Sequence, residues 1–135
     1  MNTAPRRLEL SLLPGRFAIL KLAPDARLPA WAARGSFRSV TRTCDELSII
    51  VEEAHVPAGT QSQSGWRVLR VHGPFVLSEV GVLASLTAPL AETGISVFVV
   101  STFDTDYLLV TGEQLTSAIV ALDRAGHSVH RSNHE

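Results

Sequence analysis

Apolar and polar positions follow the clearest pattern in the second half of the chain. Residues 65–71 (GWRVLRV) intersperse apolar side chains with Arg67 and Arg70, which is typical of a half-buried strand. Residues 78–94 then place Val82, Leu86 and Leu90 four positions apart, as on one face of an amphipathic helix. The pattern therefore predicts a strand followed by a helix.

The ends of this helix have their own sequence signals. Ser78 is the expected N-cap, and Gly94 suits the position just after the last turn. Glu79 suits a first helical turn, where we expect it to cap the helix; the alternative is that it contacts the ammonium group of a ligand. Pro89 lies inside the pattern, and an interior proline kinks a helix. We expect a bend at this residue, or a helix that re-forms after Thr87.

Four further segments complete the second half. Residues 95–103 (ISVFVVSTF) are too continuously apolar for a surface strand, so we expect a central strand there. The DTD stretch at 104–106 interrupts this strand, and a returning strand is expected at 107–112. An amphipathic helix is then expected at 113–126 and a short last strand at 127–129. The resulting order, β-α-β-β-α-β, is that of the ferredoxin-like fold.

The first half partly repeats this pattern. GRFAILKLA, from Gly15, resembles GWRVLRVHG, from Gly65. TRTCDELSIIV resembles TFDTDYLLV when Thr41 is aligned with Thr102. The two alignments need different offsets, so the first half has lost residues between them, and its first helix shrinks to about 28–35.

The predicted fold is therefore α+β, with two ferredoxin-like units of which the first is degenerate. We expect the first unit at residues 8–60, with an extra strand at 8–13, and the second at 65–130. Residues 1–7 and 131–135 are expected to be flexible tails.

Topology predicts where a binding site would lie. Strands 66–72 and 95–103 of a βαβ unit run parallel, so the segments that follow them meet at one end of the sheet. The helix N-terminus near Gly81 also lies there, and its free N–H groups favour an anion. Asp104 and Asp106 would attract a cation, so the site suits a zwitterion such as a free amino acid.

The stretch GVLASLTAPLAETGISVFVVSTFDTDYLLV resembles the ACT domain, and in particular tandem-ACT proteins related to the cytosolic arginine sensor of animals. This resemblance implies two ACT-type units, amino-acid sensing without catalysis, and a ligand site between ACT units. The implied ligand-binding residues are those of the loop before the first helix and of the strand-to-strand turn. They are Val80, Gly81, Val82, Leu83, Thr102, Phe103, Asp104, Thr105 and Asp106. In the first unit Arg42 replaces Phe103 in the family pattern and no glycine starts a helix, which favours one site per chain.

Other interpretations of these residues remain open. Asp104 and Asp106 are also typical turn residues, because an aspartate side chain can bond nearby backbone. A metal site would need further ligands, and the histidines at 127, 130 and 134 fall in a segment expected to fray. No nucleophile and base stand out, so we expect neither catalytic residues nor a cofactor.

Composition limits the class of partner. A net charge of -1 gives no electrostatic footprint for nucleic acid, and no apolar run is long enough to span a membrane. Cys44 is the single cysteine, which favours the cytoplasm. We expect a regulatory protein that binds an amino acid or similar zwitterion, or, alternatively, a protein–protein interaction module; either could form a homodimer.

Overall fold

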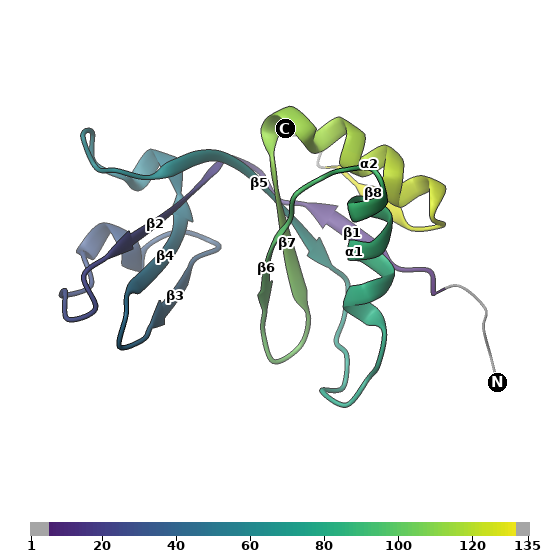
Figure 1. Ribbon diagram of the computed structural model, residues 1–135, viewed down its shortest axis with the longest axis horizontal. Coiled ribbons are helices and arrows are strands. Elements are labelled where there is room, and N and C mark those ends of the chain that lie inside the picture. Colours follow the sequence, from purple (N-terminus) through teal and green to yellow (C-terminus); the bar gives the residue numbers. More distant parts are fainter. Residues whose placement is uncertain (1–5, 132–135) are drawn as a thin grey trace. The chain divides into compact units, whose positions relative to one another are not determined.

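The computed structural model describes residues 6–131 and divides the chain into two compact units (Figure 1). The N-terminal unit is Gly15–Trp66. The C-terminal unit combines the chain up to Pro14 with the chain from Arg67 onward. The expected strand at 8–13 does form, as β1 (Glu9–Leu12), but it belongs to the C-terminal unit, because it pairs with strands of that unit on both sides. The chain therefore divides differently from the expected 8–60 and 65–130.

The tails expected at 1–7 and 131–135 fall mostly on residues outside the described part of the chain. Arg6 belongs to the first of these tails and lies within the described part, where its guanidinium donates to the carboxylate of Glu79 at 2.6 Å.

The N-terminal unit is an antiparallel sheet with two 3-10 turns. Strand β4 lies between β3 and β2, and the first residues of β5 pair with β2. The core of this unit contains Leu20, Leu47, Ile49 and Val51, with Ala32 packed against them. The elements are β2 (Phe17–Leu22), η1 (Ala30–Ala33), β3 (Ser39–Arg42), β4 (Leu47–Glu52), η2 (Glu53–His55) and β5 (Gln63–Val71).

The helix expected at 28–35 is reduced to the 3-10 turn η1. Pro29 precedes this turn and is extended, and Gly35 follows it with a φ of 107°, so only four residues are available for helical geometry. Ala32 is the one buried residue of η1. The N-terminal unit is thus a degenerate version of the fold, as the sequence predicts.

The C-terminal unit has the predicted β-α-β-β-α-β order. Its strands lie in the order β6-β7-β5-β1-β8, and both helices contribute to one core with Leu10, Leu69, Leu108 and Val110 of the sheet. Figure 1 shows α1 and α2 side by side. The elements that follow β5 are α1 (Val82–Glu92), β6 (Phe98–Ser101), β7 (Asp106–Thr111), η3 (Gly112–Gln114), α2 (Leu115–Arg124) and β8 (Ser128–His130).

Strand β6 differs from its prediction in position and length. It pairs with β7 alone among the described strands, so it is an edge strand and not a central one. Its apolar run is explained by other contacts. Ile95 is buried and its N–H bonds Leu90 O at the end of α1, while Val97 and Val99 pack against the helical core. The continuous run therefore combines a helix-terminating contact with one core-facing side of a short strand.

Helix α1 buries Val82, Leu86 and Leu90, as predicted, but begins four residues after the expected N-cap Ser78. The residue before its first turn is Gly81, in the left-handed conformation with a φ of 89°. At the other end, Gly94 stops the helix as expected, with a φ of 79° and a bond from its N–H to Ala91 O.

Pro89 does not break α1, because a histidine compensates for the bond that it removes. A proline has no N–H for the carbonyl four residues earlier, which here is Ser85 O. The Nε2 of His127 lies 2.9 Å from Ser85 O, and its Nδ1 accepts the N–H of Leu8 at 3.1 Å. The prediction that the histidine segment frays is wrong for His127, which is 2% exposed; His134 lies outside the described residues.

The internal repeat has a different register from the one that the sequence suggests. In both hairpins a four-residue turn begins with threonine: Thr43 N–H bonds Glu46 O at 2.9 Å, and Thr102 N–H bonds Thr105 O at 2.8 Å. Thr102 therefore corresponds to Thr43 and not to Thr41. A slip of two residues preserves the alternation of a strand, so hydrophobicity alone does not detect it.

The first strands of the two units also align differently. Leu20 and Leu22 face the core of the N-terminal unit, and Leu69 and Val71 face that of the C-terminal unit. Aligning Gly15 with Gly65 would place Leu20 on Arg70, which lies outside the core. The two strands therefore correspond with a shift of one residue from the sequence alignment.

Candidate functional site

A cavity of about 310 Å³ opens at one end of the C-terminal unit. Its walls are the loop after β5, the first turn of α1 and the turn between β6 and β7, which lie side by side at the lower end of Figure 1. The segments that follow β5 and β6 meet there, as topology predicts. The lining residues are Phe75, Val76, Leu77, Glu79, Gly81, Val82, Leu83, Ala84, Ser101, Thr102, Phe103, Asp104, Thr105 and Asp106.

Eight of the nine residues that the sequence nominates for ligand binding are therefore brought together in one cavity. The exception is Val80, which is 83% exposed and does not line the cavity. Six other residues that line the cavity were not among those predicted: Phe75, Val76, Leu77, Glu79, Ala84 and Ser101. The register of the hairpin could have indicated Ser101, because it is paired with Asp106 across the turn.

The turn between β6 and β7 is stabilised chiefly by Thr102. Its hydroxyl donates to Thr105 O at 3.1 Å and accepts from Thr105 N–H at 3.3 Å. The hydroxyl of Ser101 donates to Asp106 Oδ1. A threonine hydroxyl thus supplies the local side-chain contact that an aspartate turn residue would otherwise provide.

Two hydrogen bonds join this turn to the loop after β5. Phe75 N–H donates to Asp104 O at 2.8 Å, and Thr105 Oγ1 donates to Val71 O at 2.6 Å. Gly73 permits this approach, since a Cβ built there would lie 2.8 Å from Asp104 O, closer than side chains tolerate. Two walls of the cavity are therefore joined by one backbone–backbone bond and one bond from a side-chain hydroxyl.

The third wall is the N-terminus of α1. The first N–H groups of a helix have no intrahelical acceptor, and Gly81 supplies no side-chain cap to bond them. Val82, Leu83 and Ala84 of this first turn line the cavity. Gly81 has a left-handed φ, which glycine adopts more readily than other residues. Lack of space does not explain the glycine, because a Cβ built there would meet no atom within 4 Å. This end of the cavity favours a negatively charged group.

Carboxylates line the other side of the cavity. Asp106 begins β7 on the same face as the buried Leu108 and Val110, so it is directed towards the helices. Asp104 lies in the turn and also lines a neighbouring cavity of about 300 Å³ that includes Arg70 and Tyr107. Of the two aspartates, Asp106 is therefore the better placed to meet a cation in the first cavity.

Glu79 is the third carboxylate of the lining, and its partner is an arginine from the start of the chain. Arg6 Nη1 bonds Glu79 Oε2 at 2.6 Å, and Arg6 Nη2 bonds Val80 O at 3.0 Å. Glu79 thus does not cap α1, contrary to its expected role. Three carboxylates line the cavity and one of them is paired with a guanidinium, so the balance is negative and favours a cationic group.

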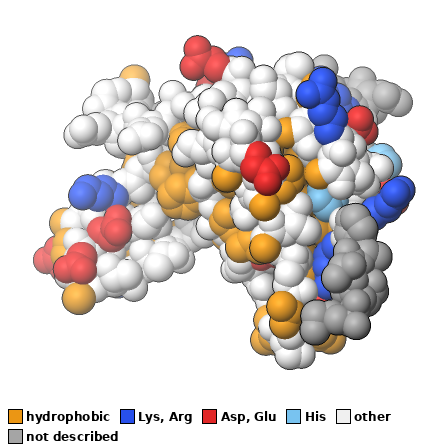
Figure 2. Space-filling model, turned by 45° about the vertical axis from the view of Figure 1, so that its right-hand side comes forward, with side chains coloured by type: hydrophobic (Ala, Val, Ile, Leu, Met, Phe, Trp, Pro, Cys, Tyr) orange, Lys and Arg blue, Asp and Glu red, His pale blue; other side chains and the backbone are white. Residues whose placement is uncertain are grey.

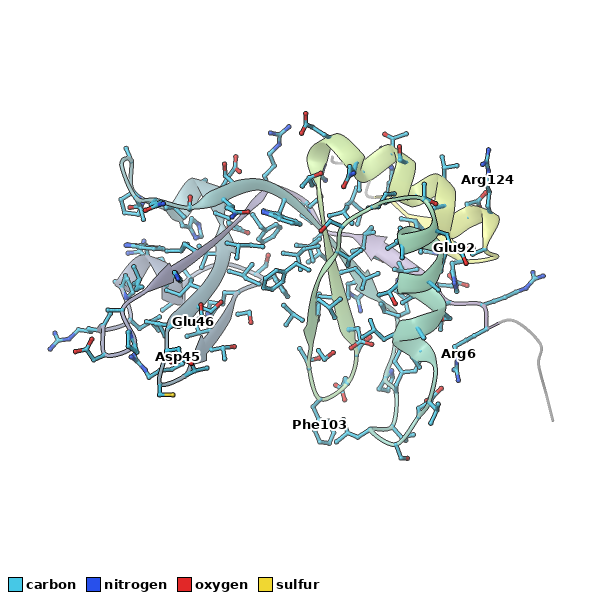
Figure 3. All side chains as sticks on the ribbon, viewed as in Figure 1. Arg6, Asp45, Glu46, Glu92, Phe103 and Arg124 are labelled. Carbon is cyan, nitrogen blue, oxygen red and sulfur yellow. The ribbon has the colours of Figure 1, made fainter. Side chains whose placement is uncertain are left out.

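Large apolar side chains surround the opening. Val76, Leu77 and Phe103 are between 67% and 77% exposed, although all three line the cavity. Figure 3 shows Phe103 at the tip of the turn, and hydrophobic side chains gather at the lower end of Figure 2. Exposed apolar groups of this size commonly mark a site that a ligand or partner covers.

The described residues offer neither a metal cluster nor a membrane-spanning helix. Within residues 6–131, no group of three or more His, Cys, Asp and Glu side chains is arranged to bind a metal ion. The same part of the chain contains no helix long and apolar enough to cross a membrane.

Comparisons with known proteins agree with this architecture. The family model for the ACT domain matches residues 61–124, and a second model, described as an N-terminal domain, matches 15–59. A crystal structure of a protein from Agobacterium tumefaciens is 40% identical, with a TM-score of 0.90 over 96% of this chain and 97% of that one. The ligand-free regulatory subunit of aspartate kinase from Thermus thermophilus has a TM-score of 0.58 over 86% and 96%; at 13% identity it shows the fold alone.

Among curated proteins, the human cytosolic arginine sensor for mTORC1 subunit 1 is 39% identical over 66 residues. The match covers 47% of this chain and 20% of the human protein, so the chain spans about a fifth of the length of that relative.

One sheet covered by two helices, with a ligand-sized cavity at the start of the first helix, defines an α+β protein of the ferredoxin-like class. Within that class, residues 61–124 match the ACT-domain family, which confirms the resemblance found in the sequence.

Proposed function

We propose that the protein is a non-catalytic cytoplasmic regulator whose C-terminal unit binds a free amino acid. The observation that carries this proposal is the cavity itself, which brings the uncapped start of α1 and the carboxylate of Asp106 into one space. A volume of about 310 Å³ is sufficient for a ligand of this size. The match of residues 61–124 to the ACT-domain family supports a regulatory, small-molecule-binding role.

The two ends of the cavity define the binding mode. The ligand carboxylate accepts hydrogen bonds from the backbone N–H groups of Val82, Leu83 and Ala84, at the helix end where the dipole favours an anion. A cationic group of the ligand contacts the carboxylate of Asp106. The Oδ1 atom of this carboxylate also accepts a hydrogen bond from the Ser101 hydroxyl. Phe103 covers the aliphatic part of the ligand.

The charges favour a basic amino acid over a neutral or acidic one. Glu79, Asp104 and Asp106 all line the cavity, whereas Arg6 is the one guanidinium bonded to them in the described contacts. A ligand with two cationic groups would balance these carboxylates better than a ligand with one. Arginine is the first ligand to test, since the human relative is named as an arginine sensor.

Isothermal titration of the full chain with arginine, lysine, leucine and glutamate tests this proposal. We expect arginine or lysine to bind most tightly, and agmatine, which lacks the carboxylate, to bind at least about tenfold more weakly because the helix start loses its partner. Asp106→Asn should weaken binding by about tenfold or more, since a charge-assisted contact is lost. Asp45→Asn, in the corresponding turn of the N-terminal unit, is the matched control and should bind normally.

No heat with any of the common amino acids would exclude amino-acid binding. The second candidate is then an interaction module, which the exposed Val76, Leu77, Val80 and Phe103 favour. It predicts an oligomer, such as a homodimer, whose mass depends on protein concentration and does not respond to amino acids. Light scattering with and without arginine separates the two candidates.

A further inference from the structure

The N-terminal unit has a structural counterpart of the cavity, and the hairpin registers identify its residues. Arg42 pairs with Leu47 across the turn of β3 and β4, just as Ser101 pairs with Asp106 across the turn of β6 and β7. Arg42 therefore occupies the position of Ser101, which lines the cavity of the C-terminal unit. Leu47 occupies the position of Asp106.

The guanidinium of Arg42 is bonded to the loop that corresponds to the cavity wall. Its Nη1 donates to Pro24 O, and its Nη2 donates to Ala26 O at 2.8 Å. Pro24 and Ala26 follow β2 and precede η1, as the cavity loop follows β5 and precedes α1. The planar fork of an arginine suits two carbonyls placed in this way.

The charges of the two places differ accordingly. The cavity of the C-terminal unit contains Asp106, whereas Leu47 is completely buried in the apolar core and offers no carboxylate. In the N-terminal unit the bound cation belongs to the chain and its acceptors are neutral carbonyls. In the C-terminal unit a short serine stands in place of the arginine, and the space is open.

We propose that Pro24 O and Ala26 O form a second cation-binding site, selective for a guanidinium group, which the chain fills with its own Arg42. Removing the Arg42 side chain opens this site to a free guanidinium compound. A further consequence, which rests on the proposed function, is that the wild-type chain binds one amino acid, because only the C-terminal cavity is open.

Chemical rescue of Arg42→Ala tests the proposal. Methylguanidinium should raise the unfolding midpoint of Arg42→Ala by about 3 °C relative to wild type at saturating concentration, because a ligand bound only to the folded state stabilises it. Methylammonium has the same charge but lacks the fork, and should give no such difference. Arg38→Ala is the matched control, since Arg38 is also an exposed arginine, and among the described residues its guanidinium donates to a single carbonyl, Gly35 O, three residues away.

The outcome does not depend on whether the C-terminal cavity binds arginine. Equal midpoint shifts in wild type, Arg42→Ala and Arg38→Ala would overturn the second site, and so would an equal response to methylammonium. If Arg42→Ala is unfolded at 25 °C, Arg42→Thr takes its place, because threonine favours the β3 strand more than alanine does and is too short to replace the guanidinium, so the rescue by methylguanidinium should persist. Absence of arginine binding to wild type would instead contradict the proposed function alone.

Discussion

The hairpins β3–β4 and β6–β7 share a turn but have different surroundings. In both, a threonine begins a four-residue turn, and its hydroxyl and N–H bond the residues that end the turn. Beside the first hairpin, Arg42 bonds the loop carbonyls. Beside the second, Gly73 lets the loop approach the turn and a cavity remains. The turn is thus a common scaffold, and the side chains next to it decide whether a ligand site is open.

Exchanging the residues that differ most between the hairpins should have the largest effect. Leu47 is fully buried whereas Asp106, at the corresponding position, is half-buried. Leu47→Asp should therefore lower the free energy of unfolding by at least about 3 kcal/mol, because it removes apolar packing and buries a carboxylate. Asp106→Leu should change it by about 1 kcal/mol or less. Urea unfolding followed by circular dichroism measures both, and similar costs would show that the two environments are equivalent.

The close approach that distinguishes the second hairpin can be removed at one glycine. The Cβ of Gly73→Ala would lie 2.8 Å from Asp104 O and 3.2 Å from Thr105 Cβ, so the loop and the turn must separate. We expect a loss of about 1–3 kcal/mol in stability, as for other overpacked sites. Ser78→Ala, at an exposed position of the same loop, should change stability by about 0.5 kcal/mol or less and serves as the control. A fully stable Gly73→Ala would mean that the contact does not constrain the loop.

Substitutions in the turn that the two hairpins share should have the smallest effects on stability, and the effects should be equal in the two units. Thr43→Ala and Thr102→Ala should each cost about 1 kcal/mol, because each removes a hydroxyl that bonds the turn backbone. Thr43→Ser and Thr102→Ser keep the hydroxyl and should recover most of the loss. A large cost at only one of the two positions, measured by the same urea titration, would show that the turns are not equivalent.

Local patterns predicted much of the fold correctly. The spacing of Val82, Leu86 and Leu90 identified the buried face of α1, and Gly94 ended that helix by adopting a left-handed conformation. These features depend on residues within one turn of each other, so the sequence contains the information. The end of the sheet at which the cavity opens also follows from the chain direction, because parallel strands bring the segments after them to one end of a sheet.

Two of the errors concern contacts between residues that are distant in sequence. Glu79 was expected to cap α1, but it is paired with Arg6, which lies 73 residues earlier. His127 was expected in a frayed segment, but it bonds Leu8, 119 residues away, and the carbonyl that Pro89 leaves without a donor. No local pattern predicts either contact.

The sequence by itself thus determined the α+β class, the order of elements in the C-terminal unit and the end of the sheet at which a site would lie. These follow from hydrophobic period and chain direction, which are local properties. The tertiary structure decided the register of the repeat and the partners of Glu79 and His127. It also decided that the C-terminal unit has an open cavity where the N-terminal unit has the side chain of Arg42. Slips of two residues leave a strand's apolar face unchanged, so only the pairing of one strand with another could place Arg42 opposite Leu47 and Ser101 opposite Asp106.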